Sequence, residues 1–206
     1  MLDTPNETRL PVHAQVLDWL ARQQQAMQDL LQKVVNIESC SRNEAGVTAV
    51  AHALAERLQA AGVPVQFEPV PGYGVLLHAQ VNPAEGADSG GAPIILMGHM
   101  DTVFPDGTVA KRPYREEVGR AYGPGVADMK SGLVLNVFVA EAFERCGGLK
   151  APLHLFFSCD EEVGSPATRD LIMARVRGGA RGVQRRARPR ERQRGHQPQR
   201  LNAGGV

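Results

Sequence analysis

The chain has little cysteine, and its three cysteines (Cys40, Cys146 and Cys159) lie far apart in the sequence. An odd number of widely spaced thiols suits neither a disulfide framework nor a cysteine-rich zinc site. The sequence also lacks an apolar run long enough to cross a bilayer, so we expect no membrane partner. Residues 1–7 lack the basic and then apolar pattern of a secretory signal. Together these absences favour a cytoplasmic protein with reduced thiols.

Lysine is absent from the last 34 residues, and acidic residues are nearly absent there. Residues 173–206 contain ten arginines and one acid, whereas residues 1–172 contain 13 basic and 21 acidic residues and carry a net charge of −8. This composition predicts that 173–206 is a disordered basic tail outside the folded domain. Arginines of this kind could bind nucleic acid only non-specifically, because the tail has no aromatic side chain to stack on a base. Nucleic acid is therefore not the favoured partner.

Apolar residues at helical spacing are present in four parts of the chain. They predict helices over residues 11–35, between Ser41 and Gly62, over 130–146 and from 165 to 173. Ser41, with Glu44 three residues later, has the pattern of a capping box for the second helix. Ser165 is the predicted N-cap of the fourth helix.

Short apolar runs between these segments predict strands over residues 63–70, 74–81, 94–101 and 153–159. A glycine at 119 predicts a short exposed hairpin over 114–122, and residues 82–91 have the composition of a loop. Since strands and helices alternate, the expected fold is α/β: a three-layer αβα sandwich around a mixed sheet.

Potential metal ligands follow three of these predicted elements. His99 and Asp101 end one strand, Asp128 follows a Gly-Pro-Gly turn, and Glu161 and Glu162 follow another strand after an aspartate. Imidazole and carboxylate together suit zinc or a related divalent ion. Asp101 could accept the spare N–H of His99, and one of the two glutamates could stay free as a general base.

Each of these features also has a simpler interpretation. A histidine at a strand end is often only exposed, an aspartate after a turn is often a helix cap, and a run of acids is often a solvated surface. Their order along the chain and their positions at the ends of apolar strands favour a site. The other five histidines lack this context and are interpreted as structural or surface residues: His13, His52, His78, His154 and His196.

Three separated segments resemble the signature segments of the co-catalytic zinc exopeptidase family. They are residues 96–103 (LMGHMDTV), 122–130 (YGPGVADMK) and 159–165 (CDEEVGS). That family includes glutamate carboxypeptidase, acetylornithine deacetylase, succinyl-diaminopimelate desuccinylase and aminoacylase. The resemblance covers residues 14–172, and the run after the two glutamates is most similar to the glutamate-carboxypeptidase branch. Residues 1–172 would then be the N-terminal part of a zinc-peptidase catalytic domain.

The resemblance implies a role for each candidate residue. His99 and Glu162 would each bind one of two zinc ions, and Asp128 would bridge them. Glu161 would be the general base and Asp101 would orient His99. Co²⁺ or Mn²⁺ are alternatives to zinc. The implied reaction is hydrolysis of an amide bond in a small peptide, or in an N-acyl amino acid if the protein is a deacylase. The residues that bind substrate are not identified.

The chain departs from this family after residue 172. Family members are longer, and they supply a further carboxylate ligand, a lid domain used for dimerisation and a last histidine ligand. None of these is recognisable in 173–206. We therefore expect impaired activity or an inactive fragment. The arginine-rich sequence suggests that the chain is truncated or read in a shifted frame after residue 172. The encoding DNA would test this, because another reading frame should then encode an apolar strand and a carboxylate after Ile172.

Overall fold

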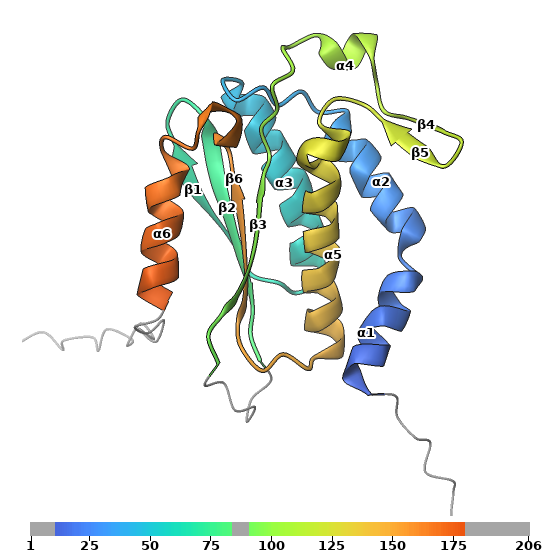
Figure 1. Cartoon of the computed structure of the whole chain (residues 1–206), viewed down its shortest axis with the longest axis vertical. Coiled ribbons are helices and arrows are strands. Elements are labelled where there is room, and N and C mark those ends of the chain that lie inside the picture. The colour runs from blue at the N-terminus through green and yellow to red at the C-terminus, as the bar shows by residue number, and fades with distance from the viewer. Residues whose placement is uncertain (1–10, 84–90, 180–206) are drawn as a thin grey trace, which may run out of the picture.

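The computed structural model describes residues 11–83 and 91–179, which form a sheet covered by helices on both faces (Figure 1). The four strands are β1 (Val65–Val70), β2 (Gly74–Val81), β3 (Ile94–His99) and β6 (Leu153–Ser158), and their order in the sheet is β1-β2-β6-β3. β2 pairs antiparallel with both β1 and β6, whereas β3 runs parallel to β6. The sheet is therefore mixed, as predicted.

Helices of very different sequence position form the outer layers. α3 (Glu44–Ala60) and α5 (Ser131–Cys146) cover one face of the sheet, with α1 (Val12–Ala21) and α2 (Gln24–Val35) packed beside them (Figure 1). α6 (Thr168–Gly179) lies on the opposite face. This arrangement confirms the predicted three-layer αβα sandwich.

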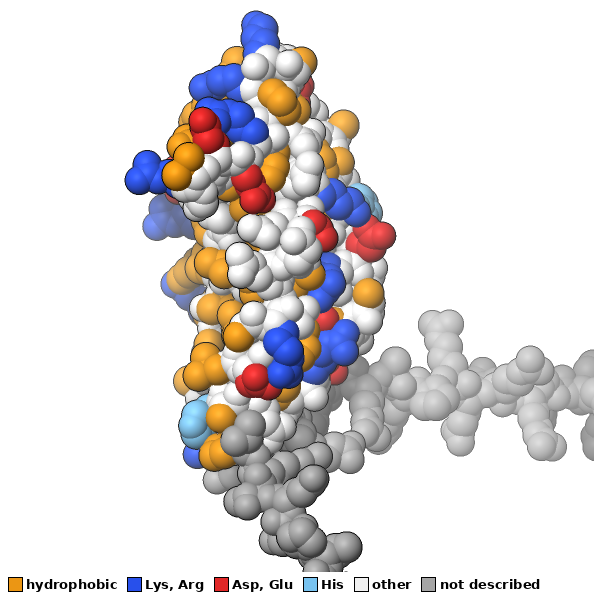
Figure 2. All heavy atoms as spheres, turned by 90° about the vertical axis from the view of Figure 1, so that its right-hand side faces the viewer, with side chains coloured by type: hydrophobic (Ala, Val, Ile, Leu, Met, Phe, Trp, Pro, Cys, Tyr) orange, Lys and Arg blue, Asp and Glu red, His pale blue; other side chains and the backbone are white. Residues whose placement is uncertain are grey.

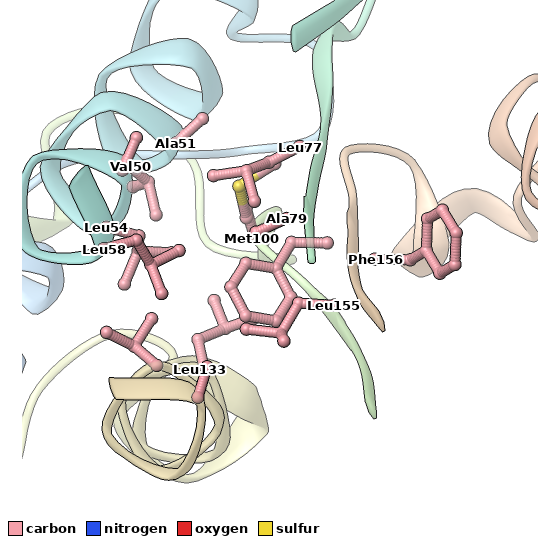
Figure 3. Packing of buried hydrophobic residues seen from close by; sticks show 14 of the residues in the cluster. Val50, Ala51, Leu54, Leu58, Leu77, Ala79, Met100, Leu133, Leu155 and Phe156 are labelled. Atoms are coloured by element: carbon pink, nitrogen blue, oxygen red, sulfur yellow. The ribbon is translucent and has the colours of Figure 1, made fainter. Parts of the chain in front are cut away.

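The main core lies between the sheet and the α3–α5 layer. Leucines of α3 and α5 meet the alternate residues of β2 and β6 that point to this face (Figure 3): Leu54, Leu58, Leu77, Leu133 and Leu155, all fully buried. Phe156 points to the other face of the sheet, where it is buried together with Ile172 of α6. The alternation along β6 thus gives the sheet two apolar faces, which is why this strand reads as a continuous apolar run.

The segment between β3 and α5 contains the short helix α4 (Thr108–Lys111) and a hairpin of β4 (Arg115–Glu117) and β5 (Arg120–Tyr122). The hairpin turns at Gly119, as the sequence predicted. None of the helices in residues 11–83 and 91–179 is both long and apolar enough to span a membrane. The predicted loop 82–91 is described only at its two ends, because residues 84–90 lie outside the described part of the chain.

Three predictions about helix ends were wrong. The helix predicted over 11–35 is two helices, because the N–H groups of Arg22 and Gln23 bond to carbonyls three residues earlier and tighten the chain into a turn. The N-cap of α3 is Asn43, whose Oδ1 accepts from the N–H of Gly46 at 2.9 Å; Ser41 lies before the helix. Ser165 also lies outside its helix, since α6 begins at Thr168.

The boundary predicted at residue 173 falls inside α6, which continues to Gly179. Arg175 explains why composition misled the prediction, because its guanidinium pairs with the carboxylate of Glu68 on β1 at 2.5 Å. Val176 also packs against the core. Residues 180–206, including His196, lie outside the described residues, and their interpretation as a tail stays a prediction.

Candidate metal centre

The parallel pairing of β3 and β6 brings the predicted site residues to the end of the sheet where both strands finish. His99 is the last residue of β3 and pairs in register with Ser158, the last residue of β6. Glu161 and Glu162 lie in the short turn that follows β6, and Asp128 lies in the irregular turn before α5. Ligand atoms of His99, Asp128 and Glu162 all lie within 4.8 Å of one another. The structure therefore assembles the three predicted metal ligands from three separate segments.

The two ring nitrogens of His99 face different partners. Nδ1 lies 3.0 Å from the backbone oxygen of Asp101 and 3.5 Å from its carboxylate. Nε2 lies 3.0 Å from the carboxylate of Asp128 and 3.7 Å from that of Glu161. A proton on Nδ1 would leave the Nε2 lone pair free for a metal ion, as in histidine ligands held by a carbonyl or carboxylate.

Burial alone would lower the pKa of His99, but hydrogen bonds to Asp101 and Asp128 outweigh it and raise the pKa to about 9. Without a metal ion, the imidazole is therefore charged at neutral pH and balances part of the surrounding carboxylate charge. A cation bound between these side chains would replace that proton.

Asp101 does more than the sequence predicted. Its fully buried carboxylate accepts hydrogen bonds from the hydroxyl of Ser41 at 2.7 Å and from the N–H groups of Glu161 and Glu162, each at 3.1 Å. Burial raises the pKa of Asp101, but the hydrogen bonds, first of all that with His99, lower it below its usual range. One carboxylate thus holds both the histidine and the turn that carries the two glutamates. Ser41, which the sequence suggested as a helix cap, supports this carboxylate instead.

Asp160, the first acid of the run, does not join the cluster. Its carboxylate accepts from the N–H groups of Ala167 at 2.7 Å and Thr168 at 3.1 Å, and from the Thr168 hydroxyl. These donors belong to Thr168, the first residue of α6, and to Ala167 before it. Asp160 thus accepts from N–H groups at the start of the helix that have no partner within it. Only the two glutamates of the run are available to the site.

Sequence reasoning missed Lys130, which supports the turn behind Asp128. The Lys130 side chain is almost fully buried, and Nζ donates to the backbone oxygen of Ile37 at 2.7 Å. Burial lowers its pKa to about 8. The sequence did offer a signal for its burial, because Lys130 directly precedes α5, whose residues are mostly apolar. The peptide bond between Asp128 and Met129 is cis, and the Asp128 side chain is 79% exposed.

A cavity of about 580 Å³ opens beside the cluster, between β3 and α6. His99 and Glu161 line the cavity, and so do several apolar side chains, among them Ile95, Met97 and Ile172. β3 can approach α5 closely on the other face only because residue 98 is glycine. A Cβ at Gly98 would lie 2.7 Å from the Cδ2 atom of Leu133.

Comparison with known proteins decides the family. Residues 95–201 match the model of Peptidase family M20/M25/M40. The chain belongs to this family. Members of the M20 family are hydrolases, and its metallopeptidases are metal-dependent, which agrees with the ligand cluster at the sheet edge. The matched range begins in β3 and continues to residue 201, within the segment that we predicted as a tail.

Two curated relatives and one solved structure illustrate the M20 similarity. The chain is 35% identical to carboxypeptidase G2 of Pseudomonas sp. (strain RS-16) over 151 residues, which are 73% of this chain and 36% of the relative. It is 37% identical to acetylornithine deacetylase of Myxococcus xanthus over 91 residues, 43% of this chain and 23% of that protein. The crystal structure of human carnosine dipeptidase 1 superposes with a TM-score of 0.67 at 20% identity, covering 81% of this chain and 38% of that one.

These similarities confirm the resemblance that the three motifs suggested. They also set its extent, because the chain spans 36% and 23% of the length of the two curated relatives. The likeness to carnosine dipeptidase at 20% identity supports the fold alone. The activity and substrates of the whole relatives therefore enter below as proposals.

Proposed function

We propose that this M20 chain carries the metal half-site of a zinc-dependent hydrolase that cleaves an amide bond and releases a C-terminal amino acid. The observation that carries the proposal is the cluster of His99, Asp128 and Glu162, with the carboxylate of Glu161 beside it. The similarity to carboxypeptidase G2 over most of the chain supports the carboxypeptidase type of reaction.

The donor set fits a zinc ion. One imidazole nitrogen and two carboxylates converge within 4.8 Å of one another, and these are nitrogen and oxygen donors of the kind that zinc takes from proteins. When bound, such an ion polarises a carbonyl oxygen and acidifies a water molecule. The resemblance implied that His99 and Glu162 bind different ions bridged by Asp128. For this chain we assign all three residues to one ion instead, because their ligand atoms all lie within 4.8 Å of one another.

Glu161 is the proposed general base. Its carboxylate lies 3.7 Å from Nε2 of His99 and is more than half exposed, so it can reach a water molecule at the cluster without being a ligand itself. Its N–H bond to Asp101 fixes the backbone while the side chain stays free. Glu161 would take the proton of the attacking water and pass it to the leaving amine. Asp101 would act by positioning His99 and this turn.

A second substrate class, N-acyl amino acids, is supported by the similarity to acetylornithine deacetylase. Both reactions break an amide bond next to an amino acid, so the same metal cluster and base serve either one. Folyl, acetyl and succinyl amino acids offered in parallel would separate a carboxypeptidase from a deacylase by the product released.

We also propose that the activity of this chain is impaired. Three protein ligands converge in the described residues, whereas two zinc ions sharing one bridge need more. The cytoplasmic location and the dimerisation of full-length relatives stay predictions. Cobalt and manganese are the alternative metals to test.

The proposed metal site can be tested by zinc binding to the 206-residue chain and its His99→Ala variant. We expect zinc to bind the parent chain, and the affinity to fall at least tenfold in His99→Ala because one of three ligands is lost. The control is His13→Ala, which removes an exposed histidine of α1. Equal zinc binding by parent and His99→Ala chains would refute the ligand assignment.

A further inference from the structure

A second cavity, of about 380 Å³, lies outside the metal cluster and is lined by three basic side chains. It is formed where α4, the β4–β5 hairpin and the turn before Asp128 meet. Lys111, Arg112 and Arg115 line it together with the aromatic rings of Phe104 and Tyr122. Its volume is in the range of pockets that hold small organic molecules. Figure 2 shows Lys and Arg side chains gathered over the upper end of the molecule, where these elements lie in Figure 1.

Both arginines of the cavity are stacked on aromatic rings. The guanidinium carbon of Arg115 lies 4.2 Å from the centre of the Tyr122 ring, its direct neighbour across the hairpin. The guanidinium of Arg112 lies 5.4 Å from the centre of the Phe104 ring. A guanidinium that lies on a ring face is held in place, while the N–H donors along its edge stay available for a planar oxyanion.

The positive charge of the cavity is only partly neutralised. Among the described residues, neither Lys111 nor Arg112 has a carboxylate within 4.0 Å, and none of the described side chains around the cavity is acidic. Arg115 pairs with Glu117, which uses part of its donor edge. Glu116 is bonded to the hydroxyl of Tyr114. Since residues 1–172 carry a net charge of −8, this local excess of cations is not a consequence of composition.

The turn from Gly123 to Val126, which leads to Asp128, also lines the cavity. This turn is packed tightly against α2, because a Cβ at Gly123 would lie 2.4 Å from the Cγ1 atom of Val35. Pro124, which is buried, also fixes the backbone here. This part of the cavity lining is therefore held in place by its packing against α2.

We propose that this cavity binds a small anion carrying two negative charges, such as a dicarboxylate or a phosphate. Two guanidinium groups and one ammonium group supply several charged donors, which suits an oxyanion of charge −2 better than a single carboxylate. The anion can be a free molecule or the anionic part of a larger amide. The proposal does not depend on hydrolysis, because it concerns residues outside the metal cluster.

Isothermal titration of the metal-free 206-residue chain with glutarate and with inorganic phosphate, at constant ionic strength and with a chelator present, tests the proposal. We expect saturable binding of one anion per chain and at least about tenfold weaker binding in Arg112→Gln, because a charge-assisted hydrogen bond is lost. Arg112→Lys should be intermediate, since it keeps the charge but not the planar group.

The matched control is Arg120→Gln, which removes the same charge from the neighbouring β4–β5 hairpin at a residue that does not line the cavity. Its binding should stay within about twofold of the parent chain. An equal loss in both variants would show diffuse attraction to surface charge and overturn the proposal, as would the absence of saturable binding. Far-UV circular dichroism of each variant checks that it folds.

Titration with N-acetylglutamate under the same conditions separates the two sources of the anion. Affinity equal to that of glutarate identifies the free dianion as sufficient. Tighter binding of N-acetylglutamate that is also lost in Arg112→Gln identifies the anionic part of an amide. Both results require the cavity, whereas N-acetylglutamate binding that is unchanged in Arg112→Gln would place that ligand elsewhere and contradict this source.

Discussion

The carboxylate of Asp101 joins three parts of the molecule at the scale of a single residue. It faces His99 of β3, receives the Ser41 hydroxyl from the segment before α3, and receives two N–H groups from the turn after β6. Because the carboxylate is fully buried, its removal would leave these donors without their acceptor. Metal binding and folding should therefore both depend on it.

Replacing Asp101 by alanine should lower the free energy of unfolding by about 3 kcal/mol, because it leaves buried donors without an acceptor. Zinc affinity should fall by about 10–100-fold as His99 and the glutamate turn lose their support. Urea unfolding without metal and zinc competition with a chelator measure the two effects. Asp106→Ala removes an exposed carboxylate that accepts only from Asn43 in the described structure, and should change neither property by much. Equal behaviour of the two variants would contradict the role of Asp101.

The raised pKa of His99 makes zinc binding dependent on pH. Below a pKa of about 9 the free imidazole carries a proton that the metal must displace, so affinity should rise about tenfold per pH unit from pH 6.5 and level off near pH 9. Zinc titrations in buffers of different ionisation enthalpy would detect the released proton. A flat profile between pH 6.5 and 8.5 would show that His99 is already neutral or is not a ligand.

At the scale of elements, the start of the helix α6 depends on Asp160, the acid directly before the two glutamates of the candidate site. Asp160 accepts two N–H groups and a hydroxyl at the start of this helix, while α6 forms one wall of the cavity beside His99. The three consecutive acids thus have different roles. Asp160 accepts hydrogen bonds at the start of α6, whereas Glu161 and Glu162 lie at the cluster.

Asp160→Ala should destabilise the protein by about 2 kcal/mol, since it removes the acceptor for the open end of α6. Hydrogen exchange should increase most at the amides of Ala167 and Thr168, which bond directly to this carboxylate. Asp170→Ala, on the exposed side of the same helix, is the matched control and should change the unfolding free energy by less than about 0.5 kcal/mol. Unchanged exchange in Asp160→Ala would refute the capping role.

The strands and most helices could be predicted from the sequence because each has its own apolar pattern. β2 occurs at the predicted residues, and the hairpin turns where its glycine indicated. The three signature segments also contain His99, Asp128 and Glu162, the residues that converge at the ends of the strands. These features depend on local sequence, and no knowledge of distant contacts was needed to find them.

Features that depend on distant partners could not be predicted in this way. Ser41 fits a capping box locally, but the buried carboxylate of Asp101, 60 residues away, takes its hydroxyl. The composition of residues 173–179 predicts a polar tail, but in the structure they continue α6 and Arg175 pairs with Glu68 of β1. Asn43 and Asp160 likewise could not be separated from neighbouring candidates, because sequence spacing does not give side-chain direction.

At the scale of the whole molecule, the strand ends bring together three proposed metal ligands, while the chain spans 36% of the length of carboxypeptidase G2. Three protein ligands and a water molecule would complete one tetrahedral zinc site, whereas a second ion would have to share Asp128 with the first. The ligand count therefore favours one strong site over two.

We expect the 206-residue chain to bind one zinc ion tightly and a second only much more weakly. Isothermal titration against a competing chelator, with zinc content after gel filtration measured by mass spectrometry, would give the stoichiometry. Glu162→Gln should abolish the strong site, while Glu144→Gln, on an exposed part of α5, should leave it intact. Two equally tight ions per chain would show that further ligands exist in the chain.

Strand β3 also has a consequence for how copies of the chain behave together. Within the described residues it is the last strand of its sheet, and Ile94 and Met97 on it are 47% and 55% exposed. Its outer row of N–H and C=O groups is a template on which another extended chain can add. Concentrated preparations should therefore tend toward intermolecular strand pairing and aggregation. The protein should be easiest to keep in solution at low concentration, where the unpaired edges of β3 in different copies seldom meet.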